Sequence, residues 1–280
     1  MRKKFINIHI RVLEEVYDLL YAVFYGLSFS GIEERLDEIV VTFPLEYWNE
    51  KESQIKRAII ESETNAQIVS EEILEDKNWN EEWEKQVPAI TVNARIGIAP
   101  EWKIAELNTE IKIIINPKMS FGTGEHSSTR LISILAEQVI KPGSYWIDAG
   151  TGTGVLAILA IKLGAERVLA FDNNYWSIDN AAENIKINEV LSHIELIEAD
   201  IDSFDFSDCD GIMANLFFNL LVPSFPCFYK GLKNNKGDLL VSGIMIYDKN
   251  EIIKAASEAG FKMINIITED EWIAIHFRTI

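Results

Sequence analysis

The chain has 280 residues, of which 48% are hydrophobic, so it can bury a sizeable core and is long enough for two domains. Its 44 acidic residues outnumber its 26 basic residues, and the formal net charge is −18. This charge disfavours a nucleic-acid partner and leaves either a basic partner or simple solubility as its explanation. No run approaches the ~18 apolar residues of a membrane span, and the two cysteines form no CxxC pair. We therefore expect a folded cytoplasmic protein without a membrane segment or a metal site.

The first 74 residues alternate between strand-like and helix-like patterns. Residues 4–10 place apolar side chains at every second position, as a half-buried strand does, whereas residues 13–24 repeat them at helical spacing. The expected elements are strands at 4–10, 27–31, 39–43 and 66–74, and helices at 13–24 and 50–64. The order β-α-β-β-α-β predicts a small ferredoxin-like α+β domain over residues 1–74.

An acidic segment, residues 75–88, is the expected connection to a second domain at 89–280. Its charge indicates either a solvated connecting helix or a surface that attracts a basic partner. Trp79 and Trp83 are four residues apart and would share one face of a helix. We expect them to pack between the two domains.

The second domain repeats strand and helix patterns up to a closing hairpin. The expected strands are 90–92, 96–98, 111–115, 145–147, 168–171, 194–197, 211–214, 239–241, 262–267 and 272–277, and the expected helices are 131–139, 155–163, 175–188, 216–229 and 249–259. Helix 175–188 should turn Ile178, Ala181, Ala182 and Ile185 inward. We expect Trp272 to pack in the core. This alternation predicts an α/β domain whose consecutive strands are parallel.

The central feature of this domain is a glycine-rich turn between strand 145–147 and helix 155–163. Gly150 and Gly152 let the backbone turn sharply and approach a ligand closely, beside the free N–H groups that begin the helix. Asp172 lies 22 residues after Gly150, at the end of the next strand. An acid about 20 residues beyond such a turn is placed to bind ribose hydroxyls, so the pattern predicts a nucleoside-containing ligand.

The spacing of the glycines leaves a dinucleotide reading open. If G-x-G-x-x-G begins at Gly150, its third glycine falls at Val155. If it begins at Gly152, the third position is Ala157, and alanine is a permitted variant there. Asp148 favours another ligand, because a carboxylate in the turn would repel a pyrophosphate but suits the cationic amino-acid end of a sulfonium cofactor. With this acid the motif resembles the D-x-G-x-G-x-G of class I methyltransferases. The resemblance implies S-adenosyl-L-methionine as cofactor and a Rossmann-like sheet of seven strands whose last strand is antiparallel.

A second motif, FGTGEHSST at 121–129, contains two glycines and leads into helix 131–139, where Ser127 or Ser128 can cap the first turn. It is close to FGTGxHxTT, and together with the acidic linker it resembles the family that methylates large-subunit ribosomal protein eleven. Ser128 departs from the family's threonine but keeps a hydroxyl. The resemblance covers nearly the whole chain and implies that the first domain recognises the substrate. It also implies that Phe121, Gly122 and Thr129 close over the methionine end of the cofactor.

Two further strand ends supply candidate site residues. Asp200 follows strand 194–197, where class I methyltransferases often contact the adenine, although it also suits an ordinary strand end. Asn215 ends strand 211–214, so it should reach the crevice beside Gly150 and Asp172. It can cap the next helix, contact the substrate, or do both, and the family resemblance implies an asparagine close to both cofactor and substrate here. The family has a motif like N-I-L-A here, whereas this chain has N-L-F-F, which puts the choice of substrate in doubt.

These residues predict methyl transfer from S-adenosyl-L-methionine to an amine. The amine must be neutral to attack, and Phe121, Phe217 and Phe218 are candidates for an apolar pocket that removes its charge. Asn215 is the expected catalytic residue, which orients the amine; His126 is a weaker candidate for a base. The expected substrate is a lysine side chain or α-amine of a basic ribosomal protein. The alternatives are another protein, a small amine, or an assembly factor that binds the cofactor without turnover.

Overall fold

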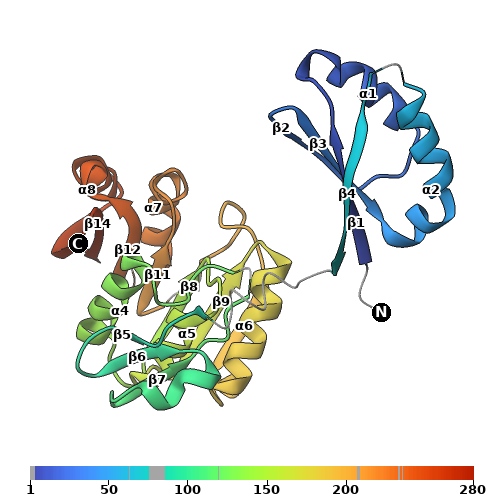
Figure 1. Cartoon of the computed structure of the whole chain (residues 1–280). Coiled ribbons are helices and arrows are strands. Elements are labelled where there is room, and N and C mark those ends of the chain that lie inside the picture. Colours follow the sequence, from blue (N-terminus) through green and yellow to red (C-terminus); the bar gives the residue numbers. More distant parts are fainter. Residues whose placement is uncertain are drawn as a thin grey trace. The chain divides into compact units, whose positions relative to one another are not determined.

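The computed structural model describes residues 4–62, 64–75, 86–118, 120–206, 209–232, 234 and 236–280. The chain divides into two compact units, Met1–Trp79 and Asn80–Ile280 (Figure 1). Their boundary falls within the segment 75–88 that the sequence marks as a connection. The expected packing of Trp79 and Trp83 lies outside the described residues.

The first unit is a four-stranded antiparallel sheet with two main helices. Its elements are β1 (Lys4–Arg11), η1 (Glu14–Val16), α1 (Tyr17–Phe24), β2 (Gly31–Arg35), β3 (Glu38–Pro44), α2 (Leu45–Ile60) and β4 (Gln67–Glu75). The strand order is β2-β3-β1-β4, and every pair is antiparallel. This confirms the ferredoxin-like fold that the sequence predicts.

The core of this unit follows the alternation of β1, whose Ile6, Ile8 and Ile10 are buried against Phe43 and Trp48. Several predicted bounds are shifted. The strand expected at 27–31 lies at Gly31–Arg35, because the chain leaves α1 through turns before it pairs with β3. As an exposed edge strand with the sequence GIEER, β2 carries little apolar signal. Helix α2 begins five residues earlier than predicted, directly after β3.

The second unit contains a seven-stranded sheet and a separate three-stranded sheet. Its first elements are β5 (Ile90–Thr91), β6 (Ile96–Ala99), η2 (Glu101–Glu106), β7 (Ile111–Ile114), α4 (Ser127–Val139), β8 (Tyr145–Ala149), α5 (Val155–Lys162) and β9 (Arg167–Asp172). The others are α6 (Tyr175–Ile187), η3 (Leu191–His193), β10 (Ile194–Glu198), β11 (Gly211–Asn215), α7 (Phe218–Leu232), β12 (Asp238–Met245), η4 (Ile246–Asp248), α8 (Lys249–Glu258), β13 (Phe261–Glu269) and β14 (Trp272–Thr279).

The large sheet has the order β10-β9-β8-β11-β12-β14-β13. Its first five strands are parallel, and β14 lies antiparallel between β12 and β13. This confirms the predicted seven-stranded sheet with one reversed strand. Because β8 lies between β9 and β11, the loops after these three strands meet at one edge.

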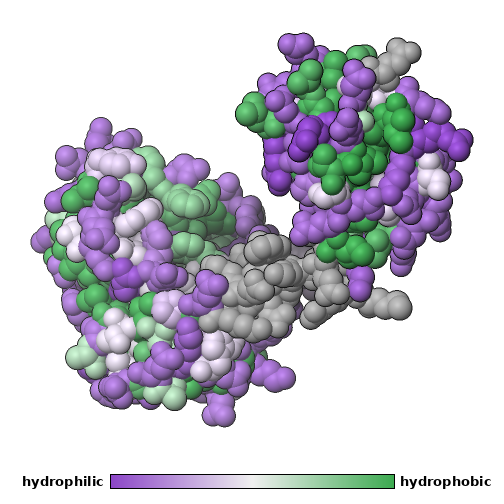
Figure 2. Space-filling view, viewed as in Figure 1, coloured by the Kyte–Doolittle hydropathy of each residue, from purple (hydrophilic) through white to green (hydrophobic). Residues whose placement is uncertain are grey.

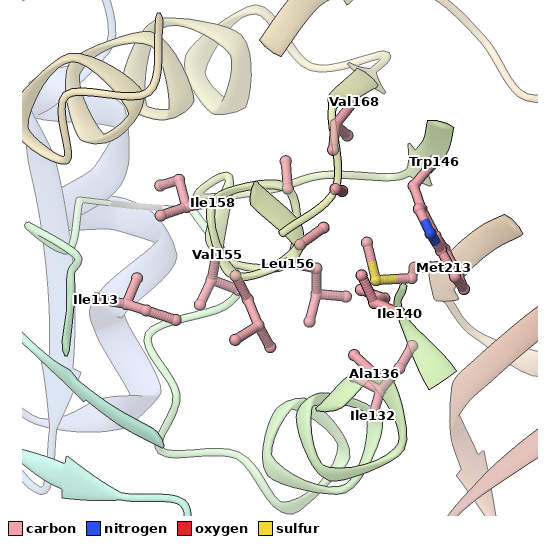
Figure 3. Packing of buried hydrophobic residues seen from close by; sticks show 14 of the residues in the cluster. Ile113, Ile132, Ala136, Ile140, Trp146, Val155, Leu156, Ile158, Val168 and Met213 are labelled. Atoms are coloured by element: carbon pink, nitrogen blue, oxygen red, sulfur yellow. The ribbon is translucent and has the colours of Figure 1, made fainter. Parts of the chain in front are cut away.

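Helix α5 is buried around most of its circumference, which explains why its sequence is apolar without a polar face. Its residues from Val155 to Ala160 are all buried. Figure 3 shows Val155 and Leu156 between Ile113 of β7 and Ile132 of α4. The glycine-rich turn therefore leads into a helix that packing on several sides holds in place.

The outer surface is mostly hydrophilic in the view of Figure 2, with smaller hydrophobic areas on both units. Within the described ranges no helix combines the length and apolar character needed to cross a bilayer.

Helix α6 differs from its predicted pattern, because Ala182 is exposed while Asn180 and Asn184 are buried. Both amide atoms of Asn184 form hydrogen bonds with backbone groups, which offsets the cost of burying that amide. Asn180 Nδ2 donates to the Asn116 carbonyl, whereas its buried Oδ1 has no partner among the described residues.

Candidate functional site

A cavity of about 260 Å³ opens at the carboxyl edge of the parallel strands. The loops after β8, β9, β10 and β11 contribute to its wall. Its lining residues are Phe121, His126, Ser128, Gly150, Gly152, Phe171, Asp172, Asn173, Ser177, Ala199, Ile201, Asn215, Leu216, Phe217, Leu220, Gly243 and Trp272. Most of this wall is apolar, and the few polar groups come from strand ends and the glycine-rich turn, as is typical of small-molecule sites.

The glycine-rich turn after β8 is held by the strand beside it. The N–H groups of Gly150 and Thr151 both donate to the carbonyl of Phe171 at 2.9 Å. Gly150 and Gly152 have φ of +72° and +55°, in the left-handed region that favours glycine. A Cβ on Gly150 would lie 2.4 Å from Leu216 Cδ2, and one on Gly152 would lie 2.4 Å from the Phe121 carbonyl oxygen. Close contacts within the protein therefore require both glycines.

Asp172 ends β9 and lies on the cavity wall, where the sequence places it. Its Oδ2 accepts a hydrogen bond from the Gly152 N–H at 3.0 Å, and its Oδ1 accepts one from the Asn174 N–H at 3.0 Å. Each carboxylate oxygen has a further lone pair. The side chain is thus fixed by two backbone donors and retains acceptor capacity for hydroxyl groups.

Asp148 lies beneath the turn instead of on the cavity wall, because it belongs to β8 itself. Its side chain is fully buried, and Oδ2 accepts from Thr151 Oγ1 at 2.6 Å and from the Ala157 N–H at 3.1 Å. Oδ1 has no hydrogen-bond partner among the described residues. Burial raises the pKa of Asp148 to about 7 against the opposing effect of these two donors. Asp148, predicted at the amino-acid end of the cofactor, is therefore a buried carboxyl group that supports the turn from below.

Asn215 is the last residue of β11 and contributes to the cavity wall. Its Nδ2 donates to Thr129 Oγ1 at 3.3 Å, and its buried Oδ1 has no partner in the described part of the chain. Helix α7 begins only at Phe218, so Asn215 does not cap it. Thr129 is fully buried and lies behind Asn215, outside the cavity wall.

An aromatic wall faces the turn, formed by Phe121, His126 and Trp272. The ring centroids of Phe121 and His126 are 5.4 Å apart, and those of His126 and Trp272 are 4.4 Å apart, both edge-to-face. Trp272 packs against the core, as expected, but its ring is only partly buried. It begins β14 at the carboxyl end of β12, which brings its half-buried ring to the cavity.

His126, rather than Ser127 or Ser128, caps α4, because its Nδ1 accepts from the Ser128 N–H at 3.2 Å. Burial lowers the pKa of His126, and the nearby Arg130 lowers it further. The imidazole is therefore neutral at neutral pH, and its Nδ1 lone pair is engaged at the helix. This favours a packing and capping function over that of a general base.

Gly122 and Asp200 lie close to the cavity but do not line it. Gly122 lies behind Phe121, where its carbonyl accepts a hydrogen bond from Thr153 Oγ1. Asp200 is exposed, and its carboxylate accepts from the Asp202 N–H at 3.0 Å. Its neighbours Ala199 and Ile201 line the cavity instead. The predicted contact of Asp200 with adenine therefore has no support from its present orientation.

Sequence reasoning missed several lining residues. Leu216, Leu220 and Gly243 come from the chain after β11 and from within β12, and Asn173 and Ser177 follow β9. A usable signal existed for most of them, because ligands in parallel sheets lie beyond the carboxyl ends of the strands. Their side chains carry no distinctive chemistry, so residue type alone does not mark them.

A seven-stranded sheet with one reversed strand and a cavity at the carboxyl edge of its parallel strands defines a class I methyltransferase. The sequence model described as ribosomal protein L11 methyltransferase (PrmA) matches residues 30–279. The chain belongs to this family.

Relatives named ribosomal protein L11 methyltransferase resemble the chain over most of its length. The protein of Chlorobaculum parvum is 35% identical over 96% of this chain and 94% of its own. That of Phocaeicola vulgatus is 34% identical over 88% of this chain and 81% of its own. The crystal structure of the ribosomal protein L11 methylase of Lactobacillus delbrueckii subsp. bulgaricus matches with a TM-score of 0.63 and 28% identity, covering 69% of this chain and 98% of that one.

Proposed function

We propose that this chain is an S-adenosyl-L-methionine-dependent enzyme that methylates amines of ribosomal protein L11, either lysine side chains or the α-amine. Membership of the family and the names of its relatives support the substrate. The observation that carries the proposal is Asn215, whose Oδ1 accepts no hydrogen bond from the described residues although the side chain contributes to the cavity wall. A buried acceptor without a partner is costly unless a ligand uses it.

The residues at the cavity fit the proposed cofactor. The carboxylate of Asp172 is held by two backbone N–H groups and has acceptor capacity for ribose hydroxyls. Ala199 and Ile201 supply an apolar surface for a base, and Phe121 and Gly150 border the other end of the cavity. When bound, the cofactor supplies a methyl group already activated on a sulfonium. The contribution of Asp148 is indirect, because it holds Thr151 and the first turn of α5.

The protein's own task is then to position a neutral amine and exclude water. Asn215 Oδ1 is the acceptor for an N–H of that amine, and its Nδ2 is fixed by Thr129. The apolar rings of Phe121, Trp272 and Phe217 border the same cavity, and an apolar environment favours the uncharged amine. Thr129 and Gly122 therefore do not contact the ligand in this proposal. Thr129 holds Asn215 in place, and Gly122 helps to hold the loop that carries Phe121.

The first unit is proposed to recognise the substrate, and residues 75–88 to connect it to the catalytic domain at 89–280. Exposed acidic side chains on the first unit, such as Glu72, suit a basic protein. No direct recognition of nucleic acid is part of this proposal. A cytoplasmic location follows from the substrate, because ribosomal proteins are made and assembled there.

Purified protein incubated with methyl-labelled S-adenosyl-L-methionine and ribosomal protein L11 tests the proposal. Label should enter L11 and not a second ribosomal protein of similar charge. N215A, compared with the wild type, should bind S-adenosylhomocysteine but transfer little label. Label found only in small amines, or cofactor binding without transfer to L11, would overturn the proposal. A thermal shift with NAD in place of the methyl donor would contradict the cofactor assignment.

A further inference from the structure

A fully buried threonine, Thr153, joins the glycine-rich turn to the loop that carries Phe121. Its N–H donates to the Phe121 carbonyl at 2.9 Å, and its Oγ1 donates to the Gly122 carbonyl at 2.7 Å. One residue therefore binds two consecutive carbonyl groups of the opposite loop. Thr153 does not line the cavity, but Phe121 does.

The glycines on both sides fit this contact closely. A Cβ on Gly122 would lie 2.8 Å from Thr153 Oγ1, and one on Gly152 would lie 2.4 Å from the Phe121 carbonyl oxygen. Both distances are shorter than any normal contact of a Cβ. The two glycine motifs of the sequence are therefore adapted to each other as well as to a ligand.

Asn184 of α6 fixes the same contact from behind. Its Nδ2 donates to the Thr153 carbonyl at 3.0 Å, and its Oδ1 accepts from the Asn116 N–H at 3.0 Å. The side chain is fully buried. Asn116 precedes Phe121 in the chain, so Asn184 ties the start of the Phe121 loop to the turn that holds its tip.

We infer that Thr153 and Asn184 are positioning residues that hold Phe121 against the cofactor. This inference rests on the proposed function, since Phe121 is useful in this position only if a ligand occupies the cavity. Without the hydroxyl of Thr153 the Gly122 carbonyl loses its donor, and a buried acceptor without a donor drives the loop to shift. The Phe121 side chain is 53% exposed and its ring packs edge-to-face on His126, so the backbone bonds from Thr153 contribute to holding the loop.

The pair T153V and T153S tests the hydroxyl separately from packing. Valine keeps the branched shape but puts a methyl group where the carbonyl oxygen now lies 2.7 Å from Oγ1, whereas a carbon–oxygen contact needs roughly 3.3 Å. Serine keeps the hydroxyl and loses only the methyl. We expect T153V to weaken S-adenosylhomocysteine binding about tenfold, as the loss of one hydrogen bond predicts, and T153S to retain most of the affinity.

Two measurements distinguish the outcomes. Calorimetry gives the affinity for S-adenosylhomocysteine, and hydrogen–deuterium exchange of the ligand-free protein reports the loop at 120–126. T153V should exchange faster in this loop alone, and T153S should not. Equal exchange and equal affinity in both variants, or a larger defect in T153S, would overturn the inference. If the wild type itself fails to bind the ligand, the proposed function fails, while the exchange data still test the contact.

A second pair comes from α6. N184A should also weaken binding about tenfold, because it removes the bonds to Thr153 and Asn116. N188A is its matched control: Asn188 lies one turn further on and bonds both backbone groups of Ile114 but not the turn. N188A should lose stability without losing affinity. Equal affinity losses in N184A and N188A would show that general destabilisation of α6, and not the contact with Thr153, is responsible.

Discussion

The amino and carboxyl ends of the seven-stranded sheet differ in whether their side-chain oxygens have hydrogen-bond partners. At the amino end, Asp210 accepts from the Tyr145 N–H at 2.8 Å, and the carboxylate of Asp238 accepts from His276 at 2.7 Å and Arg278 at 2.8 Å. At the carboxyl end, Asp148 and Asn215 each bury an oxygen that has no partner among the described residues.

The difference separates structural from functional use of the same residue types. At the amino end the buried carboxylate of Asp238 is paired, because an unpaired one would cost free energy. At the carboxyl end Asn215 contributes to the cavity wall and its acceptor is without a partner among the described residues, whereas Asp148 lies beneath the turn. The hydroxyl of Thr279, also without a partner, is an uncharged exception at the amino end. Substitutions of Asn215 and of the glycine-rich turn, which border the cavity, should therefore affect binding and turnover, whereas substitutions at the amino end should affect stability.

The largest effect is expected for G152A, which introduces a Cβ 2.4 Å from the Phe121 carbonyl oxygen. The two loops cannot keep their contact, so S-adenosylhomocysteine binding should be lost in calorimetry. G143A is the matched control near the amino end of the sheet, since Gly143 has φ +80° but no atom within 4 Å of an added Cβ. It should cost only about 1–2 kcal/mol of stability. Loss of binding in both variants would remove the distinction between the two ends.

D148N should change how stability depends on pH. The pKa of Asp148 is about 7 in the folded protein, compared with ~3.9 for an unfolded aspartate. The folded state thus holds the proton more tightly, and the free energy of unfolding falls as pH rises from about 4 to about 7, by about 4 kcal/mol in total. The variant has no such proton, so urea unfolding should show its stability rising relative to the wild type across this window. Parallel curves would contradict the raised pKa.

N215A should lower kcat for L11 methylation roughly 100-fold, the cost of a misplaced reactant, and change the affinity for S-adenosylhomocysteine much less. S242A is its control: Ser242 pairs with Asn215 across β11 and β12, is fully buried, and donates to the Ile273 carbonyl. It should lose stability and keep kcat. A weaker effect of N215A than of S242A on kcat would argue against a catalytic Asn215.

The smallest effect is expected for F217A. Phe217 lines the cavity but is 69% exposed, so its removal should leave stability unchanged and raise KM for L11 about threefold, in line with a partly buried side chain. Y247A removes another exposed aromatic ring of the same unit that does not line the cavity. Initial-rate measurements should show no change for Y247A. An equal rise in KM for both would indicate a nonspecific surface effect.

Much of the fold was predictable because apolar periodicity reports burial directly. Strand β1, helix α5 and the closing hairpin all lie close to their predicted ranges. The failures have physical reasons. Strand β2 is an exposed edge strand and carries no apolar pattern, and the buried face of α6 contains asparagines that pair with the backbone of segments far away in the chain.

The candidate site was predictable to a smaller extent. The sequence marks Gly150, Gly152, Asp172 and Asn215, because special backbone angles and strand ends have distinctive residue types, and all four line the cavity. Asp148 and Thr129, which were predicted at the cofactor, are fully buried and do not line the cavity. A spacing pattern predicts the helix, strand or turn on which a residue lies. It does not predict whether side chains from other segments bury that residue.

The sequence by itself determined the class of this protein: a parallel α/β sheet with a glycine-rich turn, an acid at the next strand end and the motif that its family shares. Only the tertiary structure decided which oxygens remain without partners, which residue caps α4, and that Thr153 binds the loop of Phe121. Two of these contacts join distant segments: Thr153 with Gly122 at a separation of 31 residues, and Asn215 with Thr129 at a separation of 86. Local residue preferences do not encode such distances.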